Sequence, residues 1–136
     1  MKAVDTNILA RFFIDDPDDE QACLQRPIAT TILSESVYVP ITVILEFEWV
    51  MRGFYKLDRA EILHIYHVLL SFAHVQIEDH TIVLTALSYY QQGLDFADSL
   101  HAARSQAYDS FITFDVKFFK KAQQITTLNV ELAKSA

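Results

Sequence analysis

The chain has 136 residues, of which 51% are hydrophobic, and its net charge is −7. This length and apolar content predict one folded domain over residues 1–136 and exclude a disordered chain. No apolar run is long enough to span a bilayer and the start lacks the apolar stretch of a signal peptide, so we expect a cytoplasmic protein with no membrane partner. The lone Cys23 excludes an internal disulfide, which suits a reducing compartment.

The first part of the chain predicts a strand, a helical region and a second strand. Residues 1–5 resemble a short buried strand that ends in an acid, and residues 7–14 have the apolar spacing of a helix. Residues 15–35 are expected to be helical on both sides of Pro27, which should kink or divide the segment. Residues 36–40 are β-branched and aromatic and stop at a proline, which predicts a strand.

The middle of the chain predicts two helices. Residues 41–55 contain β-branched residues, but their length and the stop at Gly53 favour a helix. Residues 57–72 carry an apolar stripe, and Asp58 is placed to cap this helix together with Glu61, three residues further on. The following segments alternate again, with strands expected over residues 74–79 and 109–115 and helices over residues 80–92, 95–107 and 116–122.

This alternation predicts an α/β fold with a mostly parallel central sheet flanked by helices on both faces. In open parallel sheets, ligands bind outside the carboxyl ends of the strands. Asp5 and Asp115 each end a strand. Glu46 lies one to two turns into the helix after another strand, while Asp95 and Asp98 open a further helix. We therefore expect these acids to converge at one edge of the sheet.

Such a carboxylate cluster predicts a site for a hard cation. Carboxylates that lie close together raise one another's pKa unless a cation compensates them. Oxygen ligands suit Mg²⁺ or Mn²⁺, which can activate water and stabilise displacement at phosphorus. The net acidity argues at first against a nucleic-acid partner, but bound metal ions would neutralise much of it. The sequence therefore predicts phosphodiester hydrolysis.

Four motifs carry a family resemblance: VDTNILARF, ILEFEWVMR, GLDFADSLHAA and FITFDVKFF. In this order and spacing they resemble the acidic motifs of PIN-domain nucleases, in particular the VapC-type toxins of bacterial toxin–antitoxin modules. The resemblance implies four metal-site carboxylates, Asp5, Glu46, Asp98 and Asp115, and three polar neighbours that orient them, Thr6, Asn7 and Thr113. It also implies an endoribonuclease with an RNA substrate, Mg²⁺ or Mn²⁺ as cofactor, a homodimer, and a small cognate antitoxin that binds over the site.

Two acids have more than one interpretation. Asp95 is placed as the N-cap of its helix, so we interpret it as a cap or a neighbour of the site rather than a ligand. Glu48 follows Glu46 by two positions and would point about 200° away from it on a helix. The apolar neighbours of Glu46 predict a mostly buried helix, in which a free carboxylate would be costly.

Two other functions compete with a nuclease. A response-regulator receiver would need an acidic pair after the first strand, and a haloacid-dehalogenase-like phosphatase would need an aspartate where Asn7 stands. The positions of the acids after the first strand therefore argue against both phosphoryl-transfer functions. A non-catalytic α/β protein-binding module is the stronger alternative, because the high apolar content, with several aromatic residues on the early helices, would also suit a protein interface.

Overall fold

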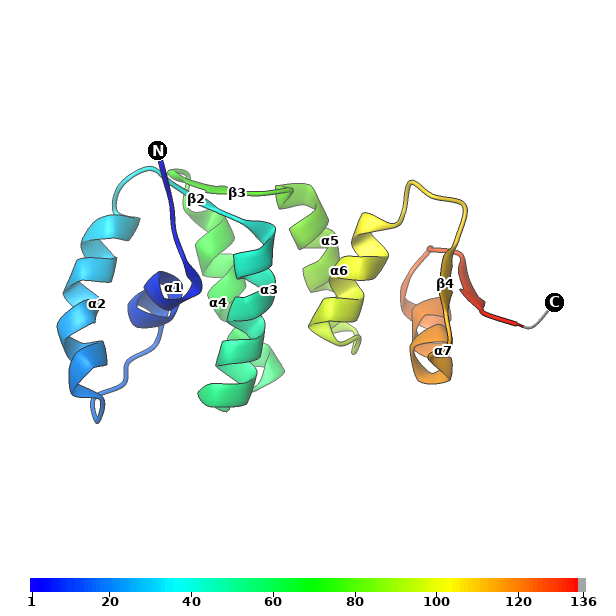
Figure 1. The fold of residues 1–136 in the computed structure, drawn as a ribbon, viewed down its shortest axis with the longest axis horizontal. Coiled ribbons are helices and arrows are strands. Elements are labelled where there is room, and N and C mark those ends of the chain that lie inside the picture. Colours follow the sequence, from blue (N-terminus) through cyan, green and yellow to red (C-terminus); the bar gives the residue numbers. More distant parts are fainter. Residues whose placement is uncertain (135–136) are drawn as a thin grey trace. The chain divides into compact units, whose positions relative to one another are not determined.

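The computed structural model describes residues 1–134, which divide into two compact units, Met1–His80 and a second unit from Thr81 onward. Helices and short parallel strands alternate along both units (Figure 1). The predicted α/β class is therefore confirmed. None of the helices within residues 1–134 is both long and apolar enough to cross a membrane.

The first unit contains a three-stranded parallel sheet in the order β1-β2-β3. Its strands are β1 (Lys2–Ala3), β2 (Val37–Val39) and β3 (Val75–Ile77). Ala3 pairs with Tyr38, which in turn pairs with Gln76. Because the strands are parallel, all their carboxyl ends lie at the same edge of this sheet.

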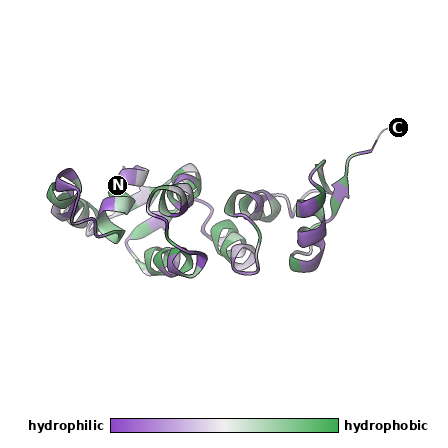
Figure 2. Ribbon diagram, turned by 90° about the horizontal axis from the view of Figure 1, so that it is seen from below, coloured by the Kyte–Doolittle hydropathy of each residue, from purple (hydrophilic) through white to green (hydrophobic). Residues whose placement is uncertain are grey.

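Four helices and one π-helical turn complete the first unit: α1 (Thr6–Phe13), α2 (Glu20–Leu33), α3 (Ile41–Trp49), η1 (Val50–Phe54) and α4 (Arg59–Ser71). In Figure 1 the short strands lie at one end of this unit and α2, α3 and α4 extend away from them. Fully buried side chains from α1, α3, η1 and α4 form the core, including Leu9, Ile44, Phe47, Met51 and Ile62. Figure 2 shows hydrophobic and hydrophilic residues alternating along the helices, as expected for helices that bury one face.

Two of the helix predictions for this unit need correction. Residues 15–19 precede the helix instead of opening it, and Asp19 caps α2 by accepting a hydrogen bond from the Ala22 N–H at 3.1 Å. Pro27 lies inside α2, which continues through it, so the prediction that Pro27 divides the segment is wrong. Proline removes one helical hydrogen bond, but burial of Ala29 and Leu33 beyond it holds the helix together.

The end of the next helix also differs from the prediction. The α-helical part stops at Trp49, and the chain then makes the π-helical turn η1 and passes Gly53 before it leaves the helix. The Tyr55 N–H donates to the Val50 carbonyl at 3.2 Å, which is the wider hydrogen bond of a π-helix. Lys56 follows with a φ of 58° and turns the chain toward α4.

The predicted start of α4 is confirmed. The Glu61 N–H donates to Asp58 Oδ1 at 2.8 Å, and the Asp58 N–H donates to Glu61 Oε1 at 3.1 Å. These two hydrogen bonds form a complete capping box.

The second unit is built on the helices α5 (His80–Gln91), α6 (Phe96–Arg104) and α7 (Val116–Ile125) and the strands β4 (Phe111–Thr113) and β5 (Val130–Leu132). The two strands form a parallel sheet of their own, in which Phe111 pairs with Val130. The sequence pattern does not predict β5. Gly93, with a φ of 118°, follows α5 as predicted, in a conformation that side chains rarely adopt.

Candidate functional site

The first unit places two of the predicted carboxylates on one pocket. Asp5 follows β1 and caps α1, with its Oδ1 accepting a hydrogen bond from the Thr6 N–H at 2.7 Å. Glu46 lies in the middle of α3. Both side chains line a pocket of about 370 Å³, and Thr6 and Asn7 line it with them. The strand end and the following helices thus bring residues 40 positions apart in sequence together.

Thr6 links α1, which Asp5 caps, to α3, which carries Glu46. Its hydroxyl donates a hydrogen bond to Glu46 Oε1 and so connects α1 with α3. Thr6 is buried, so its side chain has few other orientations available. This contact is the one through which Thr6 would orient Glu46, and that role stays a prediction.

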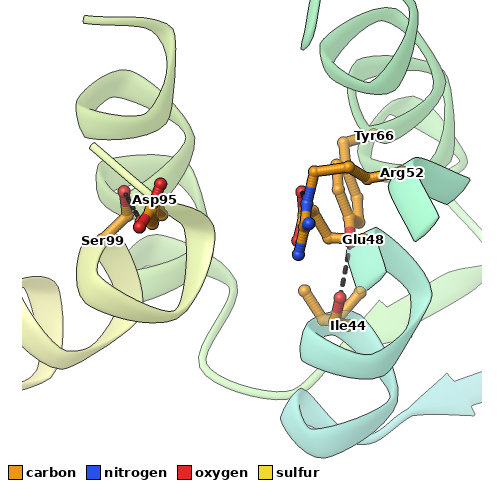
Figure 3. A network of polar contacts seen from close by, with 6 residues as sticks. All are labelled: Ile44, Glu48, Arg52, Tyr66, Asp95 and Ser99. Carbon is orange, nitrogen blue, oxygen red and sulfur yellow. Dashed lines mark hydrogen bonds and ion pairs between the residues drawn. The ribbon is translucent and has the colours of Figure 1, made fainter. Parts of the chain in front are cut away.

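Glu46 and Glu48 point in different directions, as their spacing predicts. Glu46 is exposed on the pocket, so the expectation that it lies in a buried environment is wrong. Glu48 is the buried acid, and Arg52 one turn later donates from Nε to Glu48 Oε2 at 2.9 Å (Figure 3). On the same helix, the Ile44 carbonyl accepts a 2.5 Å hydrogen bond from the Tyr66 hydroxyl. These contacts anchor α3 and leave Glu46 available for a ligand.

The second unit gathers three further acids on a smaller pocket. Asp95, Asp98 and Asp115 line about 50 Å³ of space, together with two lysines, Lys117 and Lys121. Asp98 lies in the first turn of α6 and is half-buried. Lys121 is held near this pocket by donating from Nζ to the Gly93 carbonyl at 3.3 Å.

The environment of Asp98 disfavours its negative charge. Partial burial raises the pKa of the Asp98 carboxyl, and the negative charge of Asp95 raises it further. Asp115 acts in the same direction, whereas His101 and Lys121 lower the pKa and offset part of the effect. A bound cation would relieve the remaining repulsion among these acids.

Asp115 is fixed by contacts to its neighbours in the chain. Its Oδ1 accepts a hydrogen bond from the Phe118 N–H at 2.9 Å and caps α7. Its own N–H donates to Thr113 Oγ1 at 3.0 Å. Thr113, the last residue of β4, therefore helps to set the direction in which the chain and Asp115 leave the strand.

Asp95 is at the N-cap position of α6, but its side chain makes no capping hydrogen bond. The backbone carries the contacts: its carbonyl accepts from the Ser99 N–H at 2.8 Å and from the Ser99 hydroxyl at 2.9 Å (Figure 3). The interpretation of the Asp95 side chain as a helix cap is therefore wrong. Its carboxylate acts instead as a neighbouring charge that disfavours ionisation of Asp98.

The donor chemistry of the two pockets fits Mg²⁺ or Mn²⁺. Both pockets present carboxylate oxygens, which these ions prefer, and neither contains a histidine. Within residues 1–134, no three or more acidic, histidine or cysteine side chains are grouped closely enough to hold an ion. Neither pocket by itself therefore presents a complete set of carboxylate ligands in the part of the chain that the structure describes.

Cationic and aromatic side chains also lie near these acids, and the sequence motifs assign them no role at the site. Arg11 donates from Nη1 to the Tyr55 hydroxyl at 2.9 Å and from Nε to Gln25 Oε1 at 2.8 Å. Arg11 lies one helical turn after Asn7, and that spacing was the available signal. The contribution of Tyr55 depends on the π-helical turn, which the sequence does not reveal.

Comparison with known families covers most of the chain: residues 2–124 match the PIN domain. The chain belongs to the PIN-domain family. PIN domains are generally metal-dependent nucleases, and the match spans all four carboxylates of the sequence motifs. Neither curated proteins nor solved structures gave a match. The carboxylate donors of the two pockets in this PIN domain are of the type that suits the divalent metals generally used by PIN-domain nucleases.

Proposed function

We propose that this PIN domain is an endoribonuclease that uses Mg²⁺ or Mn²⁺ and serves as the toxin of a bacterial toxin–antitoxin system. The proposal assigns the metal-binding role to four carboxylates: Asp5, Glu46, Asp98 and Asp115. The observation that carries it is the pairing of Asp5 and Glu46 on one pocket, in a chain of the PIN family. Thr6, Asn7, Asp95 and Thr113 are proposed as neighbours that orient or tune these acids.

When bound, the metal would supply a more acidic water and stabilise the charge that develops at phosphorus. The protein residues would prepare the site for this chemistry. Thr6 holds Glu46 through its hydroxyl, and backbone N–H groups hold Asp5 and Asp115 at the starts of their helices. Because these contacts fix the carboxylates in position, little reorganisation would be needed when RNA binds.

The partners follow from the resemblance to VapC-type toxins. We propose that a small cognate antitoxin covers the carboxylates and blocks RNA, and that the toxin acts as a homodimer in the cytoplasm. Exposed apolar side chains are consistent with protein contacts, among them Ile28, Phe114 and Val116. Expression without the antitoxin should slow growth, and co-expression of the antitoxin should restore it.

Cleavage of RNA by purified variants tests the proposed enzyme. We expect Mn²⁺-dependent cleavage by the wild type, and its loss in Asp5→Asn and in Asp98→Asn, because each variant removes one ionised ligand at little cost in volume. Asp18→Asn is the matched control, since Asp18 is an exposed acid that lines neither carboxylate pocket. Full activity in either Asp5→Asn or Asp98→Asn, with the metal still required, would refute the assignment of the acids.

A further inference from the structure

The pocket that contains Asp5 and Glu46 also has an aromatic wall. Trp49 and Phe54 line it with 63% and 70% of their surface exposed, and Tyr55 lines it as a half-buried residue. The rings of Phe54 and Tyr55 contact each other edge to face, with centroids 4.8 Å apart. Large aromatic side chains exposed beside a polar site are costly unless a ligand covers them.

The π-helical turn η1 creates this wall. Trp49 follows Glu46 by three residues and therefore lies on the same face of α3. In a regular α-helix the next position on that face would be Gly53, which has no side chain. The wider turn inserts one extra residue, so Phe54 and Tyr55 reach the pocket instead of Gly53. Such π-helical insertions occur frequently at functional sites.

A fixed cation lies on the same pocket. Arg11 lines it, and two hydrogen bonds, to Tyr55 and to Gln25, hold its guanidinium in place. A planar guanidinium held in this way suits a phosphate oxygen. The pocket therefore joins exposed aromatic faces, one positive charge and three carboxylates, Asp5, Asp19 and Glu46, within about 370 Å³.

We propose that this aromatic wall binds an unpaired base of the RNA, next to the phosphate that is cleaved. This inference rests on the proposed ribonuclease function and adds that Trp49 and Phe54 hold one base of the bound strand by stacking. Bases present apolar faces that stack on Trp and Phe side chains, whereas paired bases in a duplex are already stacked. Arg11 would contact a phosphate of the same strand. The size of the pocket is within the range of small-ligand sites, which favours one nucleotide as its occupant.

Trp49 is the only tryptophan of the chain, so its fluorescence reports on this wall directly. The probe is a 2′-O-methyl RNA oligonucleotide, which resists cleavage, titrated into the full chain with EDTA present. We expect saturable quenching by the single strand and none by the blunt duplex of the same sequence. Phe54→Ala, which keeps Trp49, should weaken the binding about tenfold.

Variants of Trp49 are compared by anisotropy of a labelled oligonucleotide. Trp49→Leu should weaken binding about tenfold, whereas Trp49→Phe should retain most of it, because stacking needs an aromatic face. Leu24→Ala is the control, since Leu24 is 68% exposed on α2 and does not line this pocket. Circular dichroism confirms that each variant is folded.

Unchanged binding in folded Trp49→Leu and Phe54→Ala would overturn the proposal. So would a change of oligomeric state in Trp49→Leu with unchanged RNA binding, because the wall would then be a protein interface. The same measurements distinguish failure of this proposal from failure of the ribonuclease proposal. Metal-dependent cleavage together with unchanged RNA binding by Trp49→Leu would refute only the stacking proposal. Saturable quenching without any cleavage would refute only the ribonuclease proposal.

Discussion

Asp98 is the carboxylate whose surroundings oppose its charge most clearly. Burial and the charge of Asp95 raise the pKa of its carboxyl above the ordinary value of 3.8. The folded protein then binds more protons than the unfolded chain in the range above that value, so its stability falls as the pH rises through this range. An ionised Asp98 thus lowers the stability of the metal-free protein at neutral pH.

Asp98→Asn should therefore be more stable than the wild type at pH 7 in the presence of EDTA. The difference should shrink as the pH falls and vanish below the ordinary carboxyl pKa, where Asp98 is protonated in both states. Thermal melts of both proteins between pH 3 and pH 7 measure it. A wild type that is more stable than Asp98→Asn at pH 7 would show that the negative charge is favourable even without a cation.

At the scale of single residues, the sequence predicts local contacts better than distant ones. The contact between Thr113 and the backbone of Asp115 joins residues two apart, and such neighbours are visible in the motif itself. The hydrogen bond from Thr6 to Glu46 joins α1 and α3 through the tertiary fold, so only the family resemblance pointed to Thr6 as a neighbour of the acids. The Asp95 cap failed because its geometry depends on a side-chain rotamer, which the sequence does not determine.

At the scale of the elements, α2 is the clearest departure from simple rules. Pro27 stands well inside this helix, where it lacks the N–H that would donate to the preceding turn. The helix persists because tertiary packing outweighs local propensity. The position of Pro27 is exposed, so its ring contributes little buried surface in return.

Pro27→Ala should consequently stabilise the protein. An interior proline costs a helix about 3 kcal/mol relative to alanine, and the exposed site should recover much of this. Urea unfolding of the wild type and the variant measures the change, with Ile28→Ala as an exposed control on the same helix. A lower midpoint in Pro27→Ala would mean that the proline ring supports packing that outweighs its effect on the helix.

Short strands and helix ends limit what the sequence predicts about the elements. The strand β5 has three residues, so its alternation is too brief to recognise. The π-helical turn η1 was not predicted, because the apolar period of 3.6 residues that indicates a helix does not reveal a single inserted residue. The capping box of α4 was predictable because its two acids stand three positions apart in the chain.

For the whole molecule, the order of strands and helices and the four acidic motifs were enough to predict the α/β class and the PIN family. The single domain over residues 1–136 stays a prediction, as does the convergence of all four acids. The hydrogen-bonded strands are divided between two sheets, one in each unit. Two of the proposed ligands belong to the first unit and two to the second.

Calorimetric titration with Mn²⁺ at pH 7 tests the proposed metal-binding carboxylates most directly. The comparison needs the wild type, Asp5→Asn in the first unit, Asp98→Asn in the second, and Asp18→Asn as the control. If Asp5 and Asp98 are both metal ligands, either substitution weakens Mn²⁺ binding and the control leaves it unchanged. Folded Asp5→Asn or Asp98→Asn that binds Mn²⁺ with the affinity of the wild type would contradict the account.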